Sequence, residues 1–327
     1  MKFRSACRAD APLVLYHAVS SYQLLEVMLH RLQFHSRDRA VLLLPDFITR
    51  KYPQYRKLRT RGFFNEVYLF PYLHIPHGGE KQILQDTARG YQMTVPYAIS
   101  SFSRIYVAGA HFYFSLYLLQ NRIPFIFLED AAGMLSHPER LNQGLAKTFP
   151  VHAAIARKYG LFTGENDCVR RIICLKRAQS IDVSGPRYLD FSVEEALQSL
   201  TPHTRRSIIR FFLKRRLSTR ADAILLTQHF AHLGLMSEAQ QRQLYLRLGT
   251  QVLQGVQLTI KVHPDDTLDY RALFPQAQVI REIFPSELLP YVFRKKPARL
   301  YTLDSTGCEN LREHFIIQKI NRNALLR

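Results

Sequence analysis

Cysteine is scarce in this chain and long apolar runs are missing, which excludes two broad classes of protein. The four cysteines are too few and too scattered for a disulfide framework or a zinc knuckle, so we expect a reducing compartment. They are Cys7, Cys168, Cys174 and Cys308. No apolar run reaches the roughly 20 residues that a helix needs to cross a bilayer. The short run behind the basic N-terminus predicts a buried strand, not a signal peptide.

Acidic residues are also in short supply. Lysine and arginine number 45 against 26 aspartates and glutamates, which gives a formal net charge of +19. A charge this far from zero indicates polyanionic partners such as phosphates, nucleic acid or an acidic membrane face. With 47% hydrophobic and 22% charged residues, the composition excludes a disordered tail, a coiled coil and a collagen. The length of 327 residues suggests two domains.

Short apolar runs alternate with amphipathic stretches in the first half of the chain. Apolar residues at helical spacing predict helices at 22–32 and at about 111–120. Buried-looking apolar runs predict strands at 13–18, 40–44, 66–70, 104–108 and 123–128. This alternation is typical of parallel βαβ units in a doubly wound sheet.

The alternation stops near residue 186 and restarts near residue 221. A strongly basic, helix-like segment occupies 201–220. Beyond it we predict a helix at 237–249 and strands at 223–227, 257–262, 279–280 and 300–302. The domains are then an N-terminal Rossmann-like domain, a basic linker or helix and a C-terminal Rossmann-like domain, over 1–185, 186–221 and 222–327. The fold class is α/β, with two Rossmann-like domains facing a cleft and ligands at the carboxyl ends of the strands.

Polar residues follow four of the predicted strands. They are Glu129–Asp130, Gln228–His229, His263–Pro264 and Ser305–Thr306. Each pair alone is a weak signal, because a strand-end aspartate is more often a helix cap and a His-Pro pair is more often a turn.

Together these residues fit a single chemistry. A Ser-Thr-Gly sequence that opens a helix offers hydroxyls and backbone N–H groups to a phosphate. A histidine at a neighbouring strand end can neutralise or protonate a departing phosphate, and a carboxylate can take the proton of an acceptor hydroxyl. This is the plan of a two-domain sugar-nucleotide transferase. No D-x-D pair of the kind that holds a divalent metal is present, and Asp265–Asp266 are expected to cap the next turn.

Six segments carry a resemblance to a known family. They are SSYQLLEVM at 20–28, FLEDAAG at 127–133, ILLTQHF at 224–230, IKVHPDDTLDY at 260–270, FPSELL at 284–289 and LDSTG at 303–307. In this order and approximate spacing they resemble motifs of bacterial sialyltransferases, most closely the lipooligosaccharide sialyltransferase group (glycosyltransferase family 52), and of the related bacterial polysialyltransferases. The resemblance implies two Rossmann-like domains of the glycosyltransferase B type, with the acceptor domain first and the CMP-sugar donor domain second.

The resemblance also implies roles for individual residues. Asp130 is the general base, and His263 is the general acid and phosphate partner. The residues implied to bind the donor are Gln228, Pro264, Glu287, Ser305 and Thr306. Of these, Ser305 and Thr306 would hold the donor phosphate, and Glu287 would accept the ribose hydroxyls of the cytidine. The implied reaction inverts the anomeric carbon and needs no metal or other cofactor.

The chain departs from the family pattern at three positions. Ala131 replaces the glycine that follows the acidic pair, which leaves the base open between Asp130 and Glu129. His229 replaces a proline and brings a second imidazole near the donor. Asp265 replaces an arginine and removes a positive charge near the leaving group, which indicates a different nonulosonic acid donor or a shifted acceptor preference.

Basic residues gather in two groups. One is Arg50, Lys51, Arg56, Lys57, Arg59 and Arg61, and the other is Arg205, Arg206, Arg210, Lys214, Arg215, Arg216 and Arg220. Apolar residues interleave with the second group at helical spacing. This pattern fits a solvated helix packed by its apolar face, a peripheral anchor on an anionic leaflet, or a cradle for phosphorylated lipid-linked acceptors. Nucleic-acid binding would use the charge equally well, but no helix-turn-helix, RNP or finger signature accompanies it.

The sequence therefore predicts transfer of sialic acid, or a related nonulosonic acid, from its CMP donor to a hydroxyl of a bacterial surface glycan, either lipooligosaccharide or capsule. The expected location is the cytoplasm, with peripheral contact to the inner face of the inner membrane. The alternatives are another nucleotide-sugar glycosyltransferase that uses a CMP-Kdo or UDP-sugar donor, and a basic nucleic-acid-binding protein. The sequence leaves a dimer open.

Overall fold

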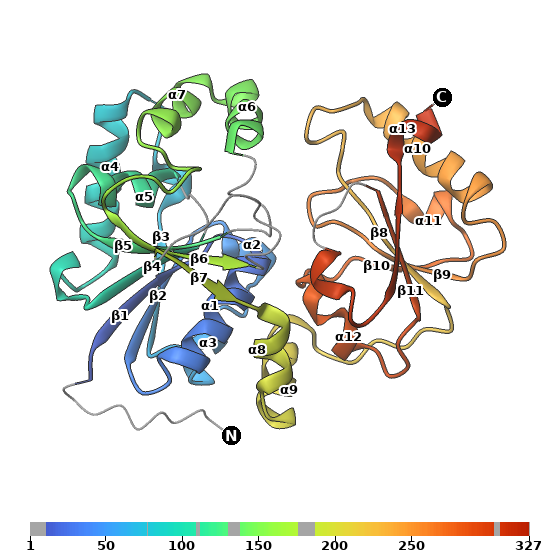
Figure 1. The fold of residues 1–327 in the computed structure, drawn as a ribbon, viewed down its shortest axis with the longest axis horizontal. Coiled ribbons are helices and arrows are strands. Elements are labelled where there is room, and N and C mark those ends of the chain that lie inside the picture. The colour runs from blue at the N-terminus through green and yellow to red at the C-terminus, as the bar shows by residue number, and fades with distance from the viewer. Residues whose placement is uncertain are drawn as a thin grey trace. The chain divides into compact units, whose positions relative to one another are not determined.

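The computed structural model describes residues 11–76, 78–108, 112–129, 138–175, 187–303 and 308–326. The chain divides into two compact units, Met1–Leu200 and Thr201–Arg327, which Figure 1 colours from blue to yellow-green and from yellow to red. Each unit is described by itself. The division falls inside the segment 186–221 that we predicted to be a basic linker or helix.

The N-terminal unit is built on a seven-stranded sheet in the order β3-β2-β1-β4-β5-β6-β7. Every pairing in this sheet is parallel. The central strands are buried on both faces, as the unbroken apolar run of residues 40–44 indicates. The strands are β1 (Leu13–His17), β2 (Arg39–Pro45), β3 (Glu66–Phe70), β4 (Arg104–Ala108), β5 (Phe125–Leu128), β6 (Val169–Leu175) and β7 (Tyr188–Phe191).

Helices connect these strands and cover the sheet (Figure 1). Side chains of α4, α5 and α7 join strand residues such as Leu15, Val107 and Phe127 in the main core of the unit. The helices are α1 (Ser21–Phe34), α2 (Ile48–Lys51), α3 (Lys57–Thr60), η1 (Tyr72–His74), α4 (Glu80–Thr94), η2 (Ile99–Ser101), α5 (Phe112–Gln120), α6 (Pro138–Thr148), α7 (Pro150–Lys158) and α8 (Val193–Ser199).

Helix α1 begins with a capping box. The Ser20 hydroxyl accepts a hydrogen bond from the backbone N–H of Gln23 (3.1 Å). The Gln23 side chain in turn accepts from the backbone N–H groups of Val19 (2.7 Å) and Ser20 (3.3 Å). This reciprocal pair satisfies N–H groups that the first turn of a helix leaves without partners. The SSYQLL segment therefore fixes where the chain turns from β1 into α1.

The C-terminal unit holds a five-stranded parallel sheet in the order β10-β9-β8-β11-β12. Its core joins Leu225 and Ile260 of the sheet to Leu244 and Leu248 of α10. The strands are β8 (Ala223–Leu226), β9 (Leu258–Lys261), β10 (Gln278–Ile280), β11 (Arg299–Leu303) and β12 (Ile316–Ile320). The helices are α9 (Pro202–Phe212), α10 (Glu238–Gln251), α11 (Tyr270–Leu273), η4 (Ser286–Leu288), α12 (Leu289–Val292), η5 (Glu309–Leu311) and α13 (Arg322–Leu326).

Both sheets reverse their strand order once. The chain runs outward from β1 to β3 and returns beside β1 as β4, and it runs outward from β8 to β10 and returns beside β8 as β11. In open parallel sheets, ligands bind outside the carboxyl ends of the strands at such a switch point. The fold thus designates β1/β4 and β8/β11 as the places to look for a site.

The structure confirms the prediction of two Rossmann-like α/β domains, with one parallel sheet in each. Sequence analysis did not predict β6, β7 or β12, and β7 lies in the segment predicted to be linker. The basic segment 201–220 is helical only over Pro202–Phe212. The three described cysteines, Cys168, Cys174 and Cys308, are free thiols. In the described part of the chain, no helix is long and apolar enough to cross a membrane.

Candidate functional site

The polar motifs of the C-terminal unit fall at the carboxyl ends of three adjacent strands. His263–Pro264 follow β9, Gln228–His229 follow β8, and Ser305–Thr306 follow β11, in the strand order β9-β8-β11. Ser305 and Thr306 themselves lie outside the described residues. The two strands on either side of the switch point, β8 and β11, are therefore among the three that end in motif residues.

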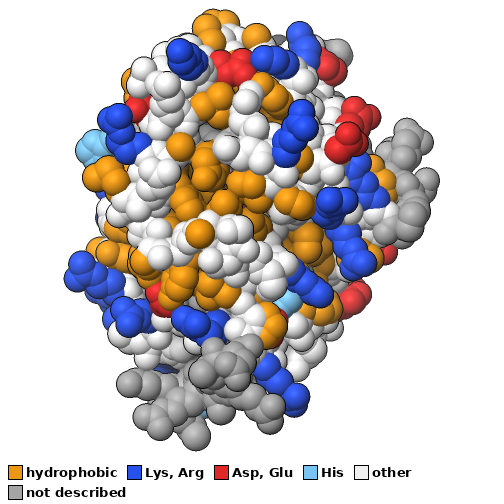
Figure 2. Space-filling model, turned by 90° about the vertical axis from the view of Figure 1, so that its left-hand side faces the viewer, with side chains coloured by type: hydrophobic (Ala, Val, Ile, Leu, Met, Phe, Trp, Pro, Cys, Tyr) orange, Lys and Arg blue, Asp and Glu red, His pale blue; other side chains and the backbone are white. Residues whose placement is uncertain are grey.

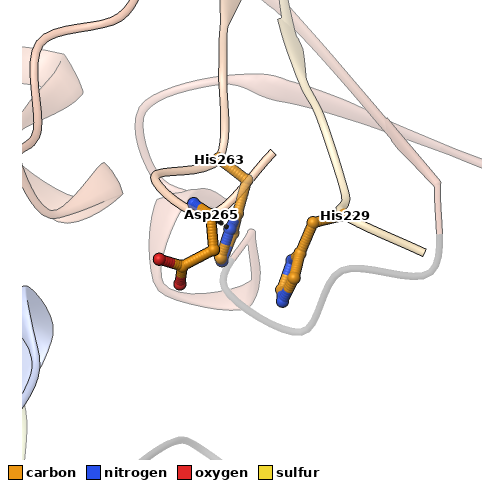
Figure 3. A group of neighbouring side chains, drawn as sticks. All are labelled: His229, His263 and Asp265. Carbon is orange, nitrogen blue, oxygen red and sulfur yellow. Dashed lines mark hydrogen bonds between the residues drawn. The ribbon is translucent and has the colours of Figure 1, made fainter. Parts of the chain in front are cut away.

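His229 and His263 lie face to face at this edge. Their ring centroids are 3.7 Å apart and their planes differ by 14°, as the stacked rings in Figure 3 show. Two imidazolium charges at this distance would repel each other strongly. An anion held at the ring edges would offset that repulsion, so the stack is suited to a phosphate.

The hydrogen bond at Nδ1 fixes the tautomer of His263. This nitrogen accepts from the backbone N–H of Asp265 at 3.2 Å. A ring nitrogen that accepts carries no proton, so the neutral His263 ring holds its proton on Nε2. His263 thus presents an Nε2–H donor to a ligand. A general-acid role would require the imidazolium form and loss of the Nδ1 contact.

A buried carboxylate braces this histidine from behind. The backbone N–H of His263 donates to the Thr227 hydroxyl (2.9 Å), which donates to Asp266 Oδ2 at 3.3 Å. Asp266 also accepts from Tyr270 Oη (2.7 Å), Gln241 Nε2 (3.1 Å) and the backbone N–H of Leu268 (3.1 Å). Burial is the main cause of the raised pKa of Tyr270, which keeps this phenol a donor. Asp266 does cap the following turn, and it also ties that turn to β8.

Gln228 is held through its backbone. Its N–H donates to the Tyr245 hydroxyl at 2.8 Å, and that hydroxyl donates back to the Gln228 carbonyl at 3.3 Å. Tyr245 is fully buried on α10, and burial raises its pKa. These two bonds position the residue by its main chain, whereas the expected role concerns its side chain.

Glu287 lies in the short helix η4 and is almost fully buried, with 2% of its surface exposed. Its carboxylate accepts from Asn310 Nδ2 (3.3 Å) and from Ser286 Oγ (3.3 Å). The role that the resemblance implies for it, acceptance from the ribose hydroxyls of the cytidine, stays a prediction.

Lys261, at the end of β9, is a residue that sequence reasoning missed. It is 5% exposed, its ammonium donates to the Val262 carbonyl (3.1 Å), and it lies 4.7 Å from the centre of the Phe284 ring. Burial lowers its pKa to about 8. Lys261 thus connects the strand that ends in His263 to the segment that leads to Glu287. Its position two residues before a strand-end histidine was the only sequence signal.

Three side chains at this edge come close enough to be tested as metal ligands. One ligand atom from each of His229, His263 and Asp265 lies within 4.8 Å of the others (Figure 3). A zinc-type ion sits about 2.0–2.1 Å from each histidine nitrogen, in line with its in-plane lone pair. Because the rings are stacked nearly parallel, one ion cannot lie in both ring planes. The group in this arrangement does not fit such an ion.

In the N-terminal unit, the two candidates for the base are Glu129, which the structure describes, and Asp130, which it does not. Glu129 follows β5, and its side chain is enclosed, with 0% of its surface exposed. Its backbone N–H donates to the Ile173 carbonyl at 2.9 Å, so the ladder with β6 continues to this residue. Alternation places Glu129 on the face of Phe127, which lies in the core. Asp130 lies outside the described residues.

A second strand end of this unit carries a buried histidine that we did not single out. His17 ends β1 at the switch point, and its Nε2 is 2.8 Å from the Tyr72 hydroxyl. Its ring stacks on Phe114 with centroids 5.0 Å apart. The signal was the same as for His263, a histidine directly after an apolar run, but no motif accompanied it.

The basic helix α9 buries its apolar side. Ile208, Phe211 and Phe212 are buried, whereas most of the basic residues from Arg206 to Arg220 are exposed. Arg205 packs over the ring of Tyr291, 4.9 Å from its centre. The apolar face is thus occupied in the folded protein, and only the charges are presented outward.

Comparison with known proteins gives the fold and little more. No family profile matches the chain. Over 84 residues, 26% of the chain, it is 33% identical to an uncharacterized protein of Haemophilus influenzae; the match spans about a quarter (27%) of that relative's length.

Solved structures match nearly the whole chain at low identity. A UDP-N-acetylglucosamine 2-epimerase from Rickettsia bellii aligns with a TM-score of 0.56 and 12% identity over 94% of this chain and 78% of its own. UGT71G1 of Medicago truncatula, complexed with UDP-glucose, aligns with 0.55 and 9% over 96% and 86%. The glycotransferase of kitacinnamycin aligns with 0.52 and 11% over 96% and 87%. The chain has the glycosyltransferase B fold that these enzymes share.

Proposed function

We propose that the protein transfers sialic acid, or a related nonulosonic acid, from its CMP donor to a hydroxyl of a surface glycan. One observation carries the proposal. The motifs at 224–230, 260–270 and 303–307, which resemble those of sialyltransferases, follow three neighbouring strands of one parallel sheet, around its switch point. Ligands of open parallel sheets bind at this edge, so the positions of Gln228 and His263 support a functional role for the motifs.

In this proposal the C-terminal unit holds the donor. The Nε2–H of His263 donates to a phosphate oxygen of CMP, and the hydroxyls of Ser305 and Thr306 donate to the same phosphate. Pro264 and Gln228 line this side, and Glu287 accepts from the ribose hydroxyls. Negative charge that develops on the phosphate as it departs is stabilised by donors that are already in place.

The N-terminal unit supplies the base. The oxygen of the acceptor hydroxyl attacks the anomeric carbon as the bond from that carbon to the phosphate oxygen breaks, and the carboxylate takes the hydroxyl proton. The configuration at the anomeric carbon inverts because the attack is direct. Asp130 is the proposed base. The enclosure of Glu129 supports this choice, since an acceptor cannot reach a fully covered carboxyl.

A second candidate is another nucleotide-sugar enzyme of the same fold. The similar structures include an epimerase named for UDP-N-acetylglucosamine and a plant enzyme complexed with UDP-glucose. Asp265, which stands where the sialyltransferase motif has arginine, fits a different nonulosonic acid donor or a shifted acceptor preference and does not by itself select this candidate. A donor such as CMP-Kdo or a UDP-sugar would use the same phosphate-binding edge.

The donor class is decided by a hydrolysis assay, which needs no acceptor. The full chain is incubated with CMP-sialic acid, CMP-Kdo, UDP-glucose and UDP-N-acetylglucosamine, and release of nucleotide is followed. We expect turnover of CMP-sialic acid, with His263→Asn inactive and the exposed neighbour His232→Asn as the matched control. If only a UDP-sugar is turned over, the assignment of a CMP-sialic acid donor is wrong. Thermal shifts with CMP, ATP and duplex DNA test the nucleic-acid alternative.

The exposed charges beyond α9 support contact with an anionic surface. Because the apolar side of α9 is buried, this contact would rest on charge, not on insertion. A cytoplasmic enzyme that works at the inner face of the membrane would meet a lipid-linked acceptor there. Its binding to anionic vesicles should therefore weaken steeply with added salt.

A further inference from the structure

The N-terminal unit contains a half-open cavity that the proposed reaction does not use. Its volume is about 520 Å³, within the range of small-molecule sites. The described residues that line it come from the C-terminal end of α1 and from strands β4 to β7. We call this cavity the arginine pocket, after Arg104, Arg170 and Arg171 at its rim.

The arginine pocket lies on one face of the sheet. Arg104 is the first residue of β4, and Arg170 and Arg171 are the second and third residues of β6. From these strand starts the lining extends to Phe191, the last residue of β7. Ile126 of β5 lines the pocket, whereas its neighbour Phe127 lies in the main core. Because side chains alternate along a strand, the pocket and that core lie on opposite faces of the sheet.

The floor of the pocket is apolar. It is formed by Tyr106, Ile126, Ile173 and Phe191, and the partly exposed Leu189 adds to it. Phe34, also in the lining, is 55% exposed. Figure 2 shows a face of the N-terminal unit with a similar character, where hydrophobic side chains gather in the middle and Lys and Arg side chains surround them. An apolar floor left open to water points to a ligand with an apolar body.

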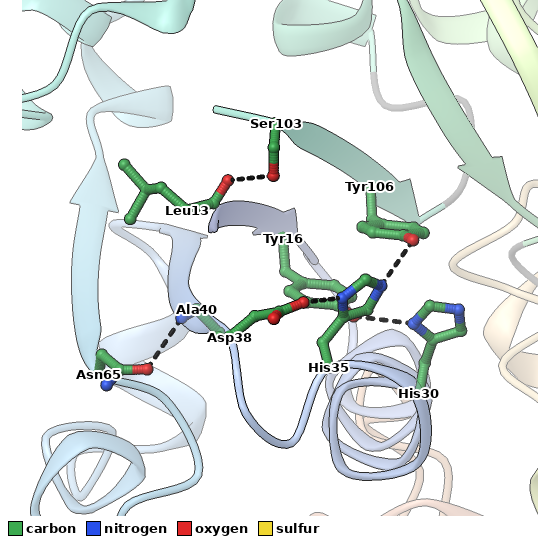
Figure 4. A network of polar contacts seen from close by, with 9 residues as sticks. All are labelled: Leu13, Tyr16, His30, His35, Asp38, Ala40, Asn65, Ser103 and Tyr106. Carbon is green, nitrogen blue, oxygen red and sulfur yellow. Dashed lines mark hydrogen bonds and ion pairs between the residues drawn. The ribbon is translucent and has the colours of Figure 1, made fainter. Parts of the chain in front are cut away.

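A rigid polar network lies under one side of the floor (Figure 4). The Tyr16 hydroxyl bonds to His30 Nδ1 (2.8 Å), and His35 bridges Asp38 (2.5 Å) and the Tyr106 hydroxyl (2.7 Å). Burial lowers the pKa of His30 to about 3, so this ring is neutral. Neutral His30 adds no positive charge, and the rim arginines dominate the electrostatics of the pocket.

The rim combines three arginines with one carboxylate, Asp190. All four side chains are exposed, and the Arg104 side chain also hydrogen-bonds to the Tyr106 hydroxyl in the floor. A guanidinium presents two parallel N–H donors to a carboxylate or phosphate. The excess of positive charge selects an anionic head group, and the floor selects the apolar part attached to it.

We propose that the arginine pocket binds an anionic amphiphile, a small molecule with a phosphate or carboxylate head and a single apolar chain. The chain lies on the floor between Ile173 and Phe191, and the head pairs with Arg104 and Arg171. The proposal does not depend on the identity of the sugar donor, because the described lining belongs to the N-terminal unit and includes no residue that we propose to bind the donor.

Isothermal titration calorimetry with dodecyl phosphate tests the proposal on the full chain, below the micelle concentration of the amphiphile. We expect saturable binding at one site, much weaker binding of inorganic phosphate, and none of the neutral dodecyl maltoside. Arg104→Gln and Arg171→Gln should each weaken binding about tenfold to a hundredfold, since a hydrogen bond to a charged group is worth roughly 1.5–3 kcal/mol. Leu189→Ser should weaken it without changing the charge.

The matched control is Arg89→Gln, an exposed arginine on α4 of the same unit that is absent from the lining. It should bind dodecyl phosphate as the native chain does, and melting temperatures should agree for all variants. Absence of saturable binding overturns the proposal. So does equal weakening in Arg89→Gln, or equal binding of dodecyl maltoside. A parallel arm with anionic vesicles separates a free amphiphile from a membrane lipid. If α9 alone contacts the membrane surface, Arg104→Gln should bind vesicles as the native chain does, while its binding of dodecyl phosphate is weakened.

Discussion

The carboxyl edges of the two sheets hold their polar side chains in different ways. In the C-terminal unit, His229 and His263 are half-buried and stacked, with a buried network of Thr227, Asp266 and Tyr270 behind them. In the N-terminal unit, His17 at the end of β1 and Glu129 after β5 are fully enclosed. The strand-end histidines of one unit are thus braced and accessible, whereas these two strand-end residues of the other are covered. Under the proposed function, the donor would bind at a braced edge, and the proposed base, Asp130, follows the enclosed Glu129 in the sequence.

The largest effect is expected at the acidic pair Glu129–Asp130, where the contrast between the two sheet edges can be tested most directly. Asp130→Asn should abolish transfer, a loss of about 10²–10⁴-fold or more for a general base, and leave CMP binding unchanged. Glu129→Gln should keep a substantial fraction of the activity and lower the stability, because its carboxyl is enclosed. Transfer rates, CMP affinity and urea denaturation of both variants decide the point. If Glu129→Gln is inactive and Asp130→Asn is active, the base assignment is reversed.

The stacked histidines come next. His263→Ala should reduce transfer by about 10²–10³-fold, the usual cost of removing one preorganised hydrogen-bond donor. The melting temperature should stay close to that of the native chain, because the side chain is at the surface edge of the network. His232→Ala, an exposed histidine whose ring lies 5.6 Å from that of His229, serves as the control and should stay active. More than half of the native activity in His263→Ala would mean that His263–Pro264 is only a turn.

A smaller effect is expected at Thr306, and it tests whether the C-terminal unit binds the donor and not the acceptor. Thr306→Val should weaken CMP binding about tenfold to a hundredfold, the value of one hydrogen bond to a charged group, and leave acceptor binding unchanged. Thr250→Val on α10 is the matched control, since its hydroxyl bonds only to carbonyls of its own helix. Calorimetric CMP affinity that does not change in Thr306→Val removes this hydroxyl from the donor site.

The smallest predicted effect concerns stability at the braced edge. The pKa of Lys261 falls from 10.5 to about 8 on folding, so the unfolded chain binds more protons between these values and stability rises with pH across this window. Below pH 8 the buried charge opposes folding. Lys261→Met should therefore stabilise the chain at pH 7 by at most about 3 kcal/mol, from 1.36 kcal/mol per pKa unit.

The gain in Lys261→Met should shrink as the pH rises from 8 toward 10.5. Urea denaturation at pH 7 and pH 9.5 measures it, and the exposed Lys295→Met provides the control, with a change within about 0.5 kcal/mol. A loss of stability in Lys261→Met at both pH values would show that its bond to the Val262 carbonyl outweighs the cost of burying the charge.

Much of the fold could be predicted because most strands are aliphatic runs that end in polar residues. The strands that escaped prediction lack that pattern. Strand β6 carries Arg170 and Arg171 near its start, and β12 is largely exposed at the edge of its sheet. Edge strands bury little, so they need few apolar residues, and periodicity gives no signal.

Of the site, only the residues that follow strands could be predicted from the sequence. The positions of Gln228 and His263 follow from the rule that ligands bind at the carboxyl ends of parallel strands. The bond from Thr227 to Asp266 joins residues 39 positions apart, and no local pattern encodes such a pairing. Lys261 was missed because its environment depends on Phe284, which a distant segment supplies. The arginine pocket likewise gathers residues of four strands and one helix end.

The capping box of α1 also bears on how such sequences are recognised. Ser20 and Gln23 satisfy backbone groups at the start of α1, so the SSYQLL segment carries information about where a helix begins. A distant sequence that shares this segment alone shares a β-strand-to-helix corner. Between distantly related sequences, function is better inferred from side chains that bonding to the local backbone does not explain. His229, whose ring stacks on that of His263, is the clearest of these.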